Sequence, residues 1–127
     1  MEHPWIPLTL RSPQDGRYEA EAVVESGSPW YDGHFPHQPM LPGIALAAFA
    51  VETLRRSREE NGEVLVLKSI KRVRFRKMIS PGDPMVFSVR SSGERAPEEF
   101  SFDVTVRDEL ACSGAFEATI ATALVAS

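Results

Sequence analysis

Several classes of protein are excluded by what the sequence lacks. Its 127 residues include one cysteine, Cys112, which rules out an internal disulfide and a zinc site made of paired cysteines. The longest strongly apolar stretch, residues 44–51, is far shorter than the roughly 20 residues that span a bilayer. The first residues lack the basic and apolar segments of a secretory signal. We therefore expect a cytoplasmic protein without a membrane partner, folded as a single domain over residues 1–127.

Basic residues are concentrated in the middle of the chain. The formal net charge is −4, yet residues 55–77 hold nine of the 14 basic residues and three acids, so this window carries +6 and the remainder −10. Such asymmetry favours an anionic partner for one surface, and a solvated face with internal compensation is the alternative. The negative total charge, and the lack of aromatic residues interleaved for base stacking, argue against nucleic acid.

Apolar periodicity predicts one helix and several strands. The helix is expected to begin after Pro42-Gly43 and to end near Gly62, because proline favours helix starts and glycine favours helix ends. The first half of the helix is apolar nearly all round, so other structure must surround it. Residues 1–16 read as an irregular segment. Two-residue alternation predicts strands over 17–25, 64–77, 84–91, 98–107 and 110–125. The second of these is expected to have an irregularity near 69–71.

One buried helix against about five mostly antiparallel strands is an α+β fold. The residues expected along the buried face of the helix are Ile44, Ala47, Ala48 and Val51. Cys112 lies in an alternating strand, and we expect it to be buried packing rather than a nucleophile.

A stiff loop precedes the helix and carries two histidines. Residues 32–43 (DGHFPHQPMLPG) contain three prolines and two glycines, which excludes a regular strand or helix. Histidine, with an unperturbed pKa of about 6.5, is a natural general base near neutral pH, which makes His34 a candidate. His34 and His37 without a third evident ligand are poor support for zinc, so we expect no metal.

Residues 33–43 (GHFPHQPMLPG), leading into an apolar helix, resemble the signature of the hot-dog-fold 3-hydroxyacyl-acyl-carrier-protein dehydratases. Residues 73–83 (VRFRKMISPGD) resemble a second recurrent stretch of that family. The resemblance implies a hot-dog fold, with five to six strands around one long central helix, and a homodimer or higher homo-oligomer with active sites at the subunit interface. It also implies the removal of water from a 3-hydroxyacyl thioester on phosphopantetheine, giving a trans-2-enoyl thioester, with no metal or other cofactor.

The resemblance also assigns roles to individual residues. His34 would take the proton beside the thioester carbonyl, and the backbone N–H of Gly43 would bind the thioester oxygen. Phe35, Pro42 and Ala48 would line the substrate site, with Phe35 in or beside the dimer interface.

The helical carboxylate of the family falls on Ala48, which has no proton to donate. Glu52 is the nearest helical carboxylate, one turn and about 6 Å further along the same face. We predict that Glu52, or a water molecule, replaces the missing acid; the alternative is that Glu52 faces solvent. Asp32 could orient His34, act as the acid or cap a turn.

The resemblance also suggests a partner, because acyl carrier proteins are strongly acidic. The candidate docking residues are Arg72, Arg74, Arg76 and Lys77, which we expect beside the tunnel that would hold the acyl chain. Two other functions stay open because of Ala48. One is a hot-dog acyl thioesterase in which Glu52 or Asp32 activates water, and the other is a non-catalytic subunit that binds acyl carrier protein.

Overall fold

A computed structural model describes residues 8–25, 43–93 and 97–122 of the chain. These residues form a helix, α1 (Gly43–Glu59), and a six-stranded sheet. The strands are β1 (Leu8–Leu10), β2 (Arg17–Ala22), β3 (Glu63–Phe75), β4 (Met85–Gly93), β5 (Glu98–Val106) and β6 (Glu109–Thr122).

The sheet runs in the order β1-β2-β4-β5-β6-β3, and every pair of neighbours is antiparallel. The expected α+β architecture is therefore confirmed. The five predicted strands are present with ends shifted by a few residues, and residues 123–125 of the last one lie outside the described residues. The prediction missed β1, which is three residues long and pairs with β2 inside a segment expected to be irregular.

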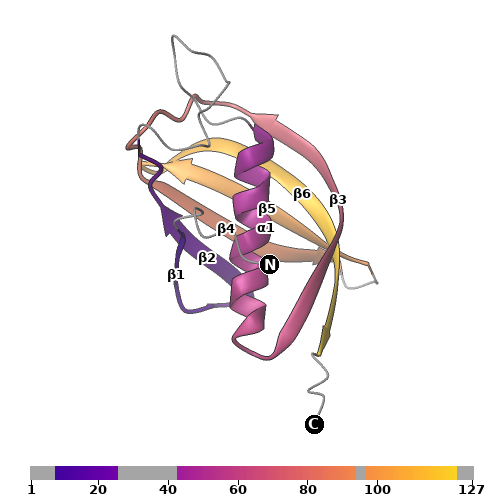
Figure 1. The fold of residues 1–127 in the computed structure, drawn as a ribbon. Helices are drawn as coiled ribbons and strands as arrows, with labels where there is room; N and C mark the ends of the chain where they lie inside the picture. The colour runs from indigo at the N-terminus through magenta and orange to yellow at the C-terminus, as the bar shows by residue number, and fades with distance from the viewer. Residues whose placement is uncertain (1–7, 26–42, 94–96, 123–127) are drawn as a thin grey trace.

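α1 lies across one face of the curved sheet, with β1 and β2 on one side of it and β3 on the other (Figure 1). It begins at Gly43 as expected, and it ends where the backbone N–H of Gly62 donates to the carbonyl of Glu59 over 2.9 Å. Gly62 has φ +75°, the left-handed conformation that glycine adopts at little cost after a helix.

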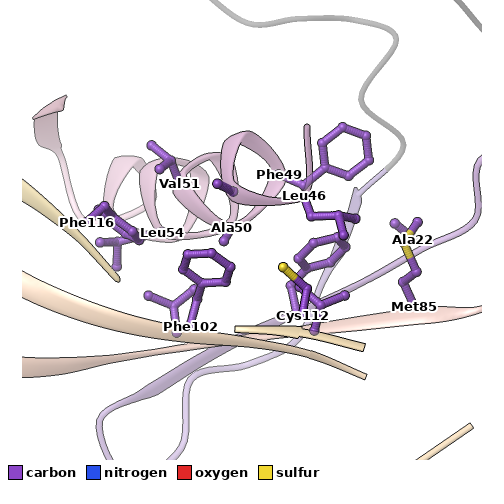
Figure 2. Packing of buried hydrophobic residues seen from close by; sticks show 14 of the residues in the cluster. Ala22, Leu46, Phe49, Ala50, Val51, Leu54, Met85, Phe102, Cys112 and Phe116 are labelled. Carbon is purple, nitrogen blue, oxygen red and sulfur yellow. The ribbon is translucent and has the colours of Figure 1, made fainter. Parts of the chain in front are cut away.

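The core lies between α1 and the sheet. Ala50 and Leu54 of α1 face Phe102 of β5 across this core (Figure 2). Its largest apolar members are the fully buried rings of Phe49, Phe87, Phe100, Phe102 and Phe116. Since burying a phenylalanine contributes about 1.5–3 kcal/mol, these rings account for much of the drive to fold.

The exposure of Ile44 differs from the expectation that it lies on the buried face of the helix. Ala47 and Val51 are buried, but Ala48 is half-buried and the side chain of Ile44 is 62% exposed in the single chain. The reason is helical geometry: Leu46, two positions on, points to the sheet, so Ile44 points away from it at the first turn.

β3 is the long outer strand beside β6, and its pairing is interrupted twice. Register shifts lie between Leu67 and Ser69 and between Lys71 and Arg74. At the second shift Arg72 has φ +55°, a left-handed backbone conformation that is unfavourable for residues other than glycine. The irregularity expected near 69–71 thus takes the form of two register shifts that flank these residues, while residues 69–71 themselves pair regularly with β6.

Candidate active site

The start of α1 is packed against β3. A Cβ atom added at Gly43 would lie 3.2 Å from Cγ1 of Val73, tighter than ordinary van der Waals contact. Glycine therefore allows the first turn of the helix to approach the strand closely. The first backbone N–H groups of a helix have no partner within it and carry partial positive charge, so this end suits an oxygen that gains negative charge.

Ala48 occupies the helical position at which the resemblance places a carboxylate. Its methyl group is half-buried on α1, one turn after the start of the helix. It contributes space and no proton, so any proton donor on α1 must lie elsewhere.

Glu52 supplies a carboxylate one turn further along α1. Its side chain is 1% exposed, so the alternative that it faces solvent is wrong. Oε1 lies 3.5 Å from Nη1 of Arg55 and 3.8 Å from Nε of Arg56. Oε2 is buried and accepts no hydrogen bond from the described part of the chain. One oxygen thus lies near two arginines, while the other has no hydrogen-bond partner among the described residues, which is unusual for a buried carboxylate.

The two arginines are neighbours of Glu52 that the sequence interpretation missed. Arg55 and Arg56 follow Glu52 at the i+3 and i+4 spacings that bring helical side chains together, so the signal was present. A buried carboxylate is tolerated when it is paired, which explains how Glu52 stays inside the fold.

The loop residues of the expected site lie outside the described residues. This applies to the base His34, to Phe35 and Pro42, and to Asp32 and His37. Their predicted roles therefore stay predictions. The described turn at residues 80–83 contacts the chain just before this loop, because the N–H of Gly82 donates to the carbonyl of Val24 over 2.9 Å.

Part of the basic cluster is neutralised by partners distant in sequence. Lys71 pairs with Glu99 at 2.9 Å and with Glu117 at 3.6 Å, and Arg72 pairs with Glu99 at 2.9 Å. The hydrogen bond to Glu99 raises the pKa of Lys71. Lys77 pairs with Glu109 at 2.8 Å. Carboxylates of the same chain thus neutralise these three cations. Two of them, Arg72 and Lys77, were expected at a docking surface.

Cys112 is fully buried between the helix and the sheet, as expected (Figure 2). Burial raises the pKa of its thiol to about 11, so it carries almost no thiolate near neutral pH.

Neither metal ligation nor a membrane span is found in the described ranges. There, no three histidine, cysteine, aspartate or glutamate side chains gather into a group able to hold a metal ion. α1 is too short and too polar to cross a bilayer.

A sheet curved around one long buried helix is the hot-dog fold. The dehydratase heterocomplex ApeI:P from Xenorhabdus doucetiae contains a chain with this fold, at a TM-score of 0.72 and 19% identity, covering 90% of this chain and 97% of that one. The ApeI-like family model, described as ApeI dehydratase, matches residues 10–115. The chain belongs to the ApeI-like dehydratase family.

Curated relatives agree with this family. The 3-hydroxyacyl-acyl-carrier-protein dehydratase FabZ of a Roseiflexus species is 33% identical over 103 residues, which are 77% of this chain and 72% of the relative. FabZ of Staphylococcus epidermidis is 32% identical over 95 residues, 71% of this chain, and the match spans 66% of that relative.

Proposed function

We propose that the protein is a 3-hydroxyacyl-acyl-carrier-protein dehydratase of fatty acid or related lipid biosynthesis. The observation that carries the proposal is Glu52, a buried carboxylate on the helix that begins at Gly43, with one oxygen that has no hydrogen-bond partner in the described part of the chain. Membership of the ApeI-like dehydratase family supports the same reaction. The reaction needs no metal and no redox cofactor, because it only moves a proton and expels water.

In the proposed mechanism, His34 removes a proton from C2 of the 3-hydroxyacyl thioester. The N–H of Gly43 stabilises the negative charge that develops on the thioester oxygen. The C3–O bond then breaks, and the departing hydroxyl leaves as water after receiving a proton. Glu52, or a water molecule bound to its Oε2, supplies that proton, while Ala48, Phe35 and Pro42 line the acyl site.

A dimeric assembly is supported by the free edge of β3. This strand ends the sheet order, and the described residues leave its outer side unpaired over 13 positions. Exposed apolar side chains lie along it: Val64, Val66 and Phe75. Because an exposed apolar edge invites pairing with another chain, we propose a homodimer or higher homo-oligomer acting in the cytoplasm on substrates carried by acyl carrier protein.

Formation of the conjugated enoyl thioester, followed by ultraviolet absorbance, tests the reaction directly. The His34→Ala variant should lose about 10²–10⁴-fold in kcat, the usual contribution of a general base. His3→Ala, which removes a histidine outside the motif, should keep the wild-type rate. A wild-type rate for His34→Ala would refute the mechanism, and release of free thiol instead of enoyl thioester would identify a thioesterase.

The acid is tested separately. Glu52→Gln keeps the shape of the side chain and should lower kcat about 100-fold, whereas Glu59→Gln on the exposed end of the same helix should leave it unchanged. Circular dichroism would check that both variants fold. Full activity of Glu52→Gln would assign proton donation to another group.

A second candidate function, a non-catalytic subunit that binds acyl carrier protein, is favoured by Ala48 alone. The similar Xenorhabdus structure is a dehydratase heterocomplex, and a second hot-dog chain would be the corresponding partner here. This function predicts that wild type binds the carrier without turnover, and that Ala48→Glu creates turnover. His34-dependent turnover by wild type would remove it.

A further inference from the structure

The two oxygens of Glu52, the only buried carboxylate among the described residues, have different surroundings. Oε1 lies 3.5 Å from Arg55 and 3.8 Å from Arg56, whereas Oε2 accepts no hydrogen bond from the described residues. The last torsion of a glutamate is soft, so without neighbours its oxygens would exchange places by rotation. Cations on one side of the carboxylate therefore decide which oxygen faces the other side.

Helical geometry sets the side from which the arginines approach. In an α-helix, side chains lean toward the N-terminus and cover the turn before their own residue. Arg55 and Arg56 therefore lean over the turn of Glu52, and Glu52 leans over the turn of Ala48. The side of the carboxylate away from the arginines is thus directed toward Ala48 and the start of the helix.

The two guanidinium groups are restrained by their surroundings. The side chains of Arg55 and Arg56 are 26% and 17% exposed, so their ion pairs with the carboxylate are screened less than those on an open surface. Arg58, the third arginine of α1, has other partners: it donates to the hydroxyl of Tyr18 over 2.8 Å and pairs with Glu63 at 2.9 Å. The arginines at the end of α1 therefore divide into a pair beside the carboxylate and one that links the helix to β2 and β3.

We infer that Arg55 and Arg56 are positioning residues for the dehydration. They hold Oε1 of Glu52 and thereby keep Oε2 turned toward the reacting hydroxyl group, or toward a water molecule that serves it. The inference rests on the proposed function, in which Glu52 takes part in delivering a proton to the departing hydroxyl. It adds that the two arginines act on the reaction through Glu52 alone.

A double-mutant cycle on kcat tests this dependence. Arg55→Gln and Arg56→Gln should each lower kcat about tenfold with KM unchanged, because a misdirected carboxylate is less effective while substrate binding is unaffected. With Glu52→Gln in place, the same two substitutions should lower kcat no further, since no carboxylate remains to be positioned. A merely structural role would lower kcat in both backgrounds.

Further variants separate positioning from folding. Loss of an arginine beside a buried carboxylate destabilises a fold, so circular dichroism must show that each variant is folded in the assay. Arg55→Lys and Arg56→Lys keep the charge but not the shape of the guanidinium, and should lower kcat only about threefold. If a glutamine variant does not fold, the lysine variants carry the cycle, and their smaller loss must likewise disappear with Glu52→Gln.

Arg11→Gln is the matched control. Arg11 also pairs with glutamates, Glu19 and Glu21, both at 3.2 Å, but on the exposed surface of the sheet. Its loss should leave kcat unchanged with or without Glu52→Gln.

The possible outcomes are distinct. A wild-type kcat for the folded arginine variants, beside an impaired Glu52→Gln, would overturn the inference and leave the proposed function standing. Equal losses with and without Glu52→Gln would also overturn it, because the arginines would then only maintain the fold. If wild type turns over no 3-hydroxyacyl thioester, the proposed function fails and the inference fails with it.

Discussion

Gly114 of β6 should not tolerate an added methyl group. In Gly114→Ala the new Cβ would lie 2.7 and 2.8 Å from two ring carbons of Phe102 and 3.2 Å from the Cα of Val73. These atoms normally approach to about 3.5–4.0 Å, so the overlap with the ring is close to 1 Å. Phe102 is fully buried and cannot swing away freely. We expect a loss of about 1–3 kcal/mol in the free energy of unfolding, typical of overpacking.

A double-mutant cycle in urea, followed by circular dichroism at fixed protein concentration, isolates the cause. Phe102→Leu alone should destabilise by leaving space in the core. In the double variant, the new methyl group occupies the space that the smaller leucine side chain leaves. The loss in the free energy of unfolding should therefore be about 1 kcal/mol smaller than the sum of the losses of the two single variants. Gly16→Ala is the control, because Gly16 has a left-handed backbone but open space around an added Cβ. Phe102→Leu should not reduce the loss of stability that Gly16→Ala causes. Strict additivity at Gly114 would refute the steric explanation.

Three further predictions concern single groups. Cys112, whose thiol pKa is raised to about 11 by burial, should react with Ellman's reagent only when urea unfolds the chain, and fast labelling of the native protein would contradict this. Asp108→Gly should stabilise the β5–β6 turn by about 0.5–1 kcal/mol, because Asp108 has φ +67°; an unchanged or lower melting temperature would count against it. The hydrogen bond from the N–H of Ser80 lowers the pKa of Asp83, with help from Arg107. The ionised Asp83 therefore stabilises the fold fully above the unfolded pKa of about 3.9, and this stabilisation is lost as the pH falls through the lower folded pKa. The urea midpoints of wild type and Asp83→Asn should converge on acidification, and a constant gap would refute the assignment.

Local signals in the sequence predicted most of the fold. Alternation predicted the strands that carry the buried Phe87, Phe100 and Phe102, because a strand with one buried face repeats every two residues. Pro42-Gly43 and Gly62 fixed the ends of α1, because caps act within one turn. β1 escaped prediction because three residues give too short a pattern, and its pairing with β2 decides its structure.

The candidate site was less predictable, because its environment is made by contacts distant in sequence. Glu52 is followed by three arginines within six residues, a pattern typical of a solvated surface, yet the surrounding structure buries it. The basic window likewise gave no hint that Lys71 and Arg72 would meet Glu99 on another strand. Charge pairs across a sheet depend on strand order and register, which a local pattern does not contain.

The cost of Glu52 bears on its role. The ion pairs of Oε1 with Arg55 and Arg56, at 3.5 and 3.8 Å, offset part of the cost of burying the Glu52 carboxylate, but Oε2 has no hydrogen-bond partner among the described residues, and a buried oxygen in that state costs about 1–3 kcal/mol. An apolar side chain of similar volume would fill the same space as well or better, since buried ion pairs are often replaced without loss of stability. Packing alone therefore does not account for a carboxylate at this position. The proposed role does account for it, because in the proposed mechanism the second oxygen of Glu52 serves a hydroxyl group or a water molecule one turn beyond Ala48.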